Sequence, residues 1–316
     1  MNLFTQENLF LRKINIRELS YFPKTPCDLH STKSPQKIII RKDSSINVDL
    51  IKGLVDKQTF EFFYQRKDHQ KISHKALETF LETSRRFSSG SREQNFKRVI
   101  YLFTNHQQHL YKNPFDSDVL LNHLKMLKIL SKVIFQNKNI LNNFFRDFKK
   151  LKFDYLQAQP INSSFFLFLF LNELDIFDHK YNEELFFTSI LKDIGMSLVD
   201  KNTLNKSELS EREKKMIDKH GQFSKKILSS TQFFSPSQLK IIEHHHDFKN
   251  HHNLAYGLEI LLISASDIIC AMMSDRPFRK ANTLYQSLDL VKHLFPKSHL
   301  LEFKALVNFS PKFFKK

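Results

Sequence analysis

The sequence predicts a mainly α-helical protein with a small α/β module near its N-terminal end. Its 316 residues include only 5 Gly and 9 Pro, which is low against average usage and indicates long elements with few turns. Hydrophobic residues make up 41% of the chain, which is enough to form a hydrophobic core and argues against global disorder. From about His74 onward the apolar residues recur at helical spacing.

Residues 1–70 differ in pattern from the rest of the chain and are expected to form the small α/β module. A β-branched run predicts the first strand, and an alternating aromatic run predicts the second. The expected order is a strand over Lys37–Arg41, a helix over Asn47–Asp56 and a strand over Thr59–Tyr64. The Pro, Ser and Thr residues of Pro23–Pro35 indicate a loop.

Residues 71–160 are expected to form a helical connector or bundle. The candidate helices are His74–Phe87, Arg92–Tyr111, Ser117–Phe135 and Ile140–Leu156. Ser88–Ser91 breaks the first from the second, and Asp116 or Ser117 is a candidate cap for the third. No catalytic spacing is recognisable in this region.

Residues 161–316 are again helical and carry the residues with chemical interest. The candidate helices are Ser163–Phe177, Glu183–Lys192, Ser210–Ser229, Ser235–His246, Leu258–Met273, Thr283–Leu294 and Ser298–Phe309. Ser210 and Glu213 have the spacing of a capping box. No internal repeat is visible.

The net charge of +16 favours anionic partners such as a nucleotide, an acidic surface or nucleic acid. A solvated basic surface explains the same charge. The basic residues are scattered along the chain and form no single stripe, so nucleic acid is not expected to be the main partner.

The chain is expected to be a cytoplasmic protein without a membrane span. Cys27 and Cys270 form no spaced metal or redox motif, which suits a reducing compartment. The N-terminal residues lack the uninterrupted apolar region of a secretory signal. The most apolar run, Phe165–Leu171, is far shorter than the roughly 20 residues that span a bilayer.

Asp267 is the most informative single position. It lies in LEILLISASDIICAMM, which predicts a helix that is apolar nearly all round and a carboxylate that is largely buried. A buried carboxylate is costly unless it is paired, protonated or bound to a metal. A structural salt bridge is the alternative to a metal site.

Histidines gather upstream of Asp267. The segment HHHDFKNHH begins at His244, and at most two of its first three rings can serve one ion because adjacent helical side chains diverge. His220 is a lone histidine in MIDKHGQF. A polar helix end and a structural histidine are the alternatives to metal ligands.

Four blocks in order resemble a known family. They are LKDIG from Leu191, KH at Lys219, IIEHHHD from Ile241, and SASDIICAMMSDRPFRK from Ser264. This order is similar to the HD-GYP family, whose members are metal-dependent phosphodiesterases of the HD superfamily that hydrolyse cyclic di-GMP. The resemblance covers about 150 residues and implies an HD-GYP-type all-helical domain.

The resemblance implies roles for individual residues. Asp193 matches the aspartate of the HD pair, which bridges the metals. The later metal ligands are matched by His220, His245, His246 and Asp267, and the basic positions facing the phosphates by Arg276 and Arg279. Mixed imidazole and carboxylate donors suit Fe, Mn or Zn.

The departures from the family are as informative as the matches. Lys192 stands where the histidine of the HD pair is expected, and Met196 where a basic residue is usual. The GYP tripeptide is absent, and Pro160–Ser164 offers no upstream histidine. A charged lysine has no lone pair for a metal. We therefore expect fewer ions than in intact relatives, with the Lys192 ammonium balancing Asp193 and Asp267.

Three functions remain open. The first is a degenerate sensor of cyclic di-GMP or a related nucleotide, or an interaction module for other signalling proteins, with little hydrolysis. The second is an unconventional metal-dependent phosphodiesterase in which Lys192 lies beside the catalytic Asp193. The third is a metal-free structural scaffold. HD-GYP domains are often fused to regulatory domains, so the resemblance implies a regulatory role for residues 1–70.

Overall fold

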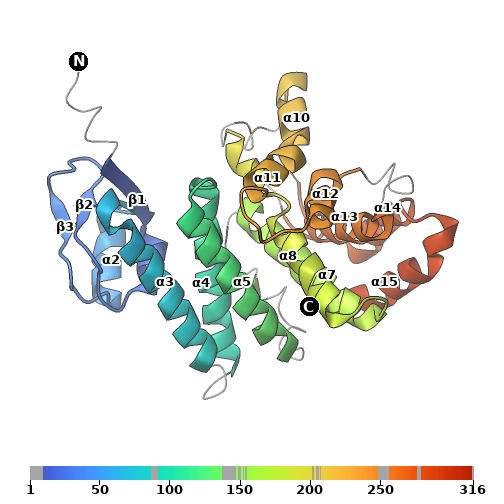
Figure 1. Cartoon of the computed structure of the whole chain (residues 1–316), viewed down its shortest axis with the longest axis horizontal. Helices are drawn as coiled ribbons and strands as arrows, with labels where there is room; N and C mark the ends of the chain where they lie inside the picture. The colour runs from blue at the N-terminus through green and yellow to red at the C-terminus, as the bar shows by residue number, and fades with distance from the viewer. Residues whose placement is uncertain are drawn as a thin grey trace. The chain divides into compact units, whose positions relative to one another are not determined.

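The fold is mainly helical with one small antiparallel sheet, as the sequence predicts. A computed structural model describes residues 10–86, 92–136, 147–148, 151, 153, 155–200, 203, 206, 208–247, 256–275 and 279–314. The chain divides into two compact units, Met1–Leu130 and Ser131–Lys316, which Figure 1 colours from blue to green and from green to red. The functional division at residues 70 and 160 stays a prediction.

The first unit contains a four-stranded sheet in the order β1-β4-β2-β3. The strands are β1 (Leu11–Asn15), β2 (Leu29–Ser31), β3 (Ile38–Ile40) and β4 (Glu61–Gln65). β1 pairs antiparallel with β4, placing Ile14 opposite Phe62, and both side chains are buried. Inward residues thus alternate with outward ones, as half-buried strands require.

Helices complete the first unit. They are α2 (Val48–Asp56), α3 (His69–Arg85), α4 (Arg92–Lys112) and the part of α5 (Ser117–Gln136) up to Leu130, with short 3-10 helices η2 (Ile16–Tyr21) and η3 (Arg66–Asp68). The Tyr21 hydroxyl of η2 donates to the Leu102 carbonyl of α4 over 2.5 Å. Tyr21 in turn accepts from Thr79 of α3 through its own carbonyl, over 2.6 Å, so η2 ties these two helices together.

Two predictions for the first unit need correction. The segment Pro23–Pro35 is not entirely loop, because it contains β2, and β1 was not predicted at all. Both are short strands stabilised by pairing with the distant β4, and periodicity within a short segment does not reveal such pairing. The cap at Asp116 is confirmed, since its side chain accepts from the backbone N–H groups of Asp118 and Val119.

The second unit is built around the apolar helix α7. Its helices are α7 (Tyr155–Leu174), α8 (His179–Leu191), α10 (Glu211–Asp218), α11 (His220–Leu228), α12 (Pro236–His244), α13 (Gly257–Met272), α14 (Leu284–Lys292) and α15 (Leu300–Phe313), with 3-10 helices η6 (Ile194–Leu198) and η8 (Lys297–His299). Phe165, Phe166 and Phe168 of α7 are fully buried. α7 packs against α8, α13 and α15.

Several predicted boundaries in the second unit were wrong. α7 begins at Tyr155 and continues through Pro160, although proline usually marks a helix start or break. The single helix expected over Ser210–Ser229 is two, α10 and α11, with Lys219 between them. The capping box of Ser210 and Glu213 is confirmed. Most of the helix expected over Ile140–Leu156 lies outside the described residues.

Two further findings concern the cysteines and the helix lengths. Cys27 and Cys270 are free and buried. Among the described residues, none of the helices combines the length and apolar character needed to cross a bilayer.

Candidate metal centre

The candidate site lies where the ends of three helices of the second unit meet the middle of a fourth. Lys192 and Asp193 follow the last residue of α8, and His220 is the first residue of α11. His245 and His246 follow the end of α12, and Asp267 lies within α13. Segments far apart in the sequence therefore supply the candidate ligands.

Two glycines permit the close packing that brings these ends together. A Cβ on Gly195 would lie 2.1 Å from the His220 carbonyl oxygen, and one on Gly221 would lie 2.6 Å from the Glu243 carbonyl oxygen. Neither gap has room for a methyl group. η6 can therefore lie directly on α11, and α11 directly on α12. The Ser224 hydroxyl accepts from the Gly195 N–H over 2.8 Å and fixes the first of these contacts.

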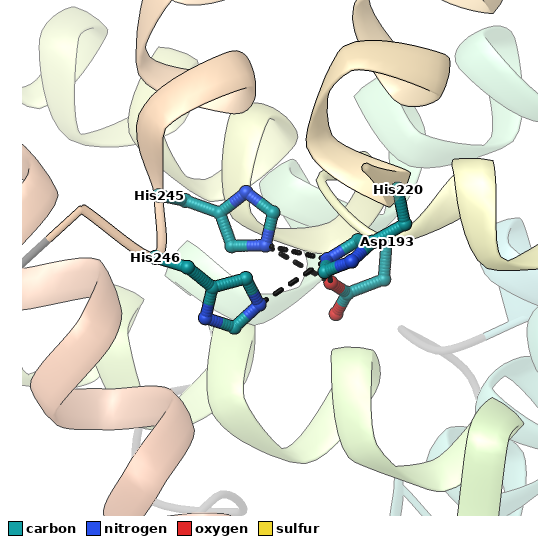
Figure 2. Close-up of side chains that lie close together, drawn as sticks. All are labelled: Asp193, His220, His245 and His246. Atoms are coloured by element: carbon teal, nitrogen blue, oxygen red, sulfur yellow. Dashed lines mark hydrogen bonds and ion pairs between the residues drawn. The ribbon is translucent and has the colours of Figure 1, made fainter. Parts of the chain in front are cut away.

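The side chains of Asp193, His220, His245 and His246 converge on one point (Figure 2). One ligand atom from each lies within 4.8 Å of the others. The His245 Nε2 is 3.1 Å from the His220 Nε2 and 3.2 Å from the Asp193 Oδ1. The His246 Nε2 is 3.2 Å from the His220 Nε2. The structure thus brings together four of the residues that the sequence analysis assigned to metal binding.

Backbone carbonyls fix the proton positions of two of these rings. The Nδ1 of His220 lies 2.6 Å from the Ile217 carbonyl, and the Nδ1 of His245 lies 2.6 Å from the Ile242 carbonyl. Each Nδ1 must carry a proton to donate to a carbonyl, so each neutral ring turns a bare Nε2 toward its neighbour. Such a second partner commonly orients histidines that bind metals.

The convergence leaves lone pairs facing one another. Two bare imidazole nitrogens and a carboxylate oxygen repel each other unless a cation or a proton lies among them. Burial lowers the pKa of His220, but the hydrogen bond and charge of Asp193 outweigh it and raise that pKa. The site therefore attracts positive charge, and its donor set suits a divalent transition metal.

Lys192 forms the other half of the site. Its side chain is completely buried, and its ammonium donates to Asp193 Oδ2 and, over 2.8 Å, to Asp267 Oδ1. Burial alone would lower the pKa of Lys192, but the two carboxylates outweigh it and raise that pKa. The ammonium is therefore charged at neutral pH.

Both carboxylates remain ionised as well. Burial raises the pKa of Asp193 and of Asp267, but the Lys192 charge together with the neighbouring histidines and hydrogen bonds outweighs burial, so both values lie below their usual range. Asp193 thus has one oxygen on the ammonium and the other facing the imidazoles. Only that second oxygen is directed toward the histidine cluster.

Gln159 belongs to the site and was missed in the sequence. Its side-chain N–H group lies 2.8 Å from the Asp267 backbone carbonyl and 3.1 Å from Asp267 Oδ1. It lies on α7, about thirty residues before Lys192, near where the resemblance expects a histidine. The sequence signal for Gln159 was a polar residue just before an apolar segment, but the helix expected there was predicted to begin only at Ser163.

The structure describes one of the two arginines that were predicted to face a phosphate. Arg279 donates to the carbonyls of Ala271 and Met272 at the end of α13, over 2.9 and 3.4 Å, and to the Asn282 side chain over 3.1 Å. It therefore caps a helix C-terminus, a favourable place for a cation. Arg276 lies outside the described residues.

Comparison with known proteins identifies the fold. No protein-family model and no curated protein matches the chain. Among solved structures, the chain is similar to Bd1817, described as an HDG"Y"P protein from Bdellovibrio bacteriovorus. The TM-score is 0.64 at 15% sequence identity, over 94% of this chain and 99% of that one. The fold that the four sequence blocks implied is thereby confirmed.

Proposed function

We propose that this chain, which has the fold of an HD-GYP protein, is a degenerate member of that family that binds cyclic di-GMP or a related nucleotide with little or no hydrolysis. One observation carries the proposal. The buried Lys192 ammonium binds both Asp193 and Asp267, the two carboxylates that the family uses for its first metal. With a fixed cation at that position, the donors that remain for a metal are Asp193 Oδ1 and the three histidines of the cluster.

The remaining donors support a site for one divalent ion. Asp193 Oδ1, His220, His245 and His246 would hold it, and the Nε2 atoms of His220 and His245 are bare because each Nδ1 donates to a backbone carbonyl. Such an ion would polarise a phosphate oxygen and lower the pKa of a bound water. Lys192 contributes a positive charge at the neighbouring position, but as an ammonium with no lone pair it has no means of activating a water.

The loss of the second metal accounts for weak hydrolysis. Two-metal sites stabilise both the attacking and the leaving oxygen of an in-line displacement. Here the Lys192 ammonium already donates to two carboxylates, which hold it in place. One ion and one ammonium would position a phosphate group without completing the cleavage machinery.

Phosphate recognition is the part of the proposal that rests on Arg276. Arg279 donates to backbone carbonyls at the end of α13, so replacing it would remove the cap of that helix. Arg276 is therefore the better test of ligand binding, because replacing Arg279 would also remove a helix cap.

The test is a binding and turnover assay with cyclic di-GMP and added Mn²⁺ or Fe²⁺. We expect calorimetry to detect binding, and chromatography to detect almost no linear dinucleotide or GMP. Arg276→Ala should weaken binding about tenfold through the loss of a charge-assisted contact. Robust turnover would instead support the unconventional phosphodiesterase, and absence of both binding and turnover would support the metal-free scaffold.

A further inference from the structure

The first unit contains a groove of about 860 Å³ between α2 on one side and α3 and α4 on the other. Its floor includes Leu19, Phe22 and Leu102, all of which are buried in the core of this unit. The volume lies in the range of pockets that bind ligands. The groove belongs to the first unit alone and shares no residue with the candidate metal centre.

One wall of this groove is an apolar stripe on α2. Val48, Ile51 and Val55 line it at helical spacing, and Val48 and Val55 are 68% and 46% exposed. Leu54 on the same helix is buried, so α2 packs on the core through Leu54 while the stripe lines the groove. Single exposed apolar residues are ordinary, but here two of them, together with the half-buried Ile51, continue the apolar surface of the floor.

The rim of the groove is predominantly basic. Four basic and two acidic side chains line it, namely Lys52, Lys75, Arg86, Arg98, Asp56 and Glu82. Lys75 is bound to Glu78 over 2.9 Å. Lys52 on α2 and Arg98 on α4 are both exposed, and they flank the apolar floor from opposite walls.

We propose that this groove binds an amphipathic helix of a partner protein, with an apolar face on the floor and acidic residues toward Lys52 and Arg98. Helices dock in grooves of this kind through apolar anchors at i, i+3, i+4 and i+7. The basic rim selects an acidic helix over a basic one, because opposite charges across a rim steer association and like charges oppose it. The net charge of +16 over the whole chain favours the same kind of partner.

The experiment uses the full chain and two labelled peptides of about 16 residues, long enough to fold on a surface. Both carry leucines at the four anchor positions; one has glutamate and the other lysine at the flanking positions. Fluorescence anisotropy should show tighter binding of the glutamate peptide by about tenfold or more. A scrambled glutamate peptide serves as the control for charge alone.

Variants of the chain test the apolar wall and the basic rim separately. Val55→Asp should weaken the glutamate peptide about tenfold or more by placing a charge against its apolar face. Leu290→Asp is the matched control, since Leu290 is 50% exposed on α14 and lies outside the groove. The double change Lys52→Glu with Arg98→Glu should reverse the preference between the two peptides, and thermal unfolding checks that each variant is folded.

Three results would overturn the proposal. The scrambled peptide could bind as well as the patterned one, or Val55→Asp could have no more effect than Leu290→Asp. Sedimentation could also show a dimer of the chain that Val55→Asp dissolves, which would make a second copy the occupant. None of these results depends on metal or nucleotide, so they leave the proposed function untouched.

Discussion

Lys192→Ala is expected to lower the free energy of unfolding by about 3–5 kcal/mol, because it removes the partner of two largely buried carboxylates. The side chain of Lys192 is completely buried, and its ammonium contacts both Asp193 and Asp267. Without it, the two aspartates repel each other in a poorly solvated place. Chemical denaturation followed by circular dichroism measures the loss.

Two further variants isolate the charge as the cause. Lys192→Met keeps most of the side-chain volume and should lose nearly as much stability, so that a cavity does not explain the result. Lys226→Ala is the matched control, because Lys226 is an exposed residue of α11 and should change stability by less than about 0.5 kcal/mol. A loss for Lys192→Met no larger than that of Lys226→Ala would contradict the account.

The same pair predicts a pH dependence with a definite sign. The Lys192 charge holds the pKa of Asp193 and of Asp267 below the usual range. Groups with a depressed folded-state pKa stabilise the fold above the unfolded-state value of about 4 and lose that contribution as the pH falls through the folded-state pKa. The difference between the wild type and Lys192→Met should therefore shrink in strong acid.

Gly195→Ala is expected to disturb both the fold and the metal centre. Its Cβ would lie 2.1 Å from the His220 carbonyl oxygen and 2.7 Å from the Ser224 backbone nitrogen. Because backbone atoms have little freedom to move aside, α11 must shift and carry His220 with it. We expect a loss at the upper end of the about 1–3 kcal/mol typical of overpacking, together with weaker metal binding.

Gly53→Ala is the matched control for this prediction. A Cβ on Gly53 would have nothing within 4 Å, and the residue lies inside α2. Alanine there should stabilise the chain by about 0.5–1 kcal/mol, since glycine is costly in a helix. Thermal unfolding and metal titration of both variants test the pair. Unchanged metal affinity in Gly195→Ala would contradict the role assigned to this contact.

The sequence predicted the helical fold and much of the candidate site because both depend on local signals. Asp267 stood out as a carboxylate on an apolar helix, and the histidines stood out as a cluster. The pairing of Lys192 with Asp193 and Asp267 was expected from the resemblance, which places Lys192 at a metal-ligating histidine beside two carboxylates that need a cation. The metal-binding roles themselves stay predictions.

Other features could not be predicted because they depend on contacts between distant segments. β1 carries Arg12 and Lys13 between its apolar residues, and it becomes a strand only by pairing with β4. Arg279 caps α13 because the chain after that helix turns back toward its carbonyls. Gln159 joins the site only because α7 begins earlier than Pro160 suggested.

The proposed function depends on the replacement of one metal ion of the site by Lys192. Its most direct test is the metal content, by elemental analysis, of protein purified without chelator. We expect about one divalent ion per chain in the wild type, and about two when Lys192→His and Gln159→His together place imidazoles beside Asp193 and Asp267. Two ions per chain in the wild type, or no gain in the double variant while it remains folded, would contradict the claim.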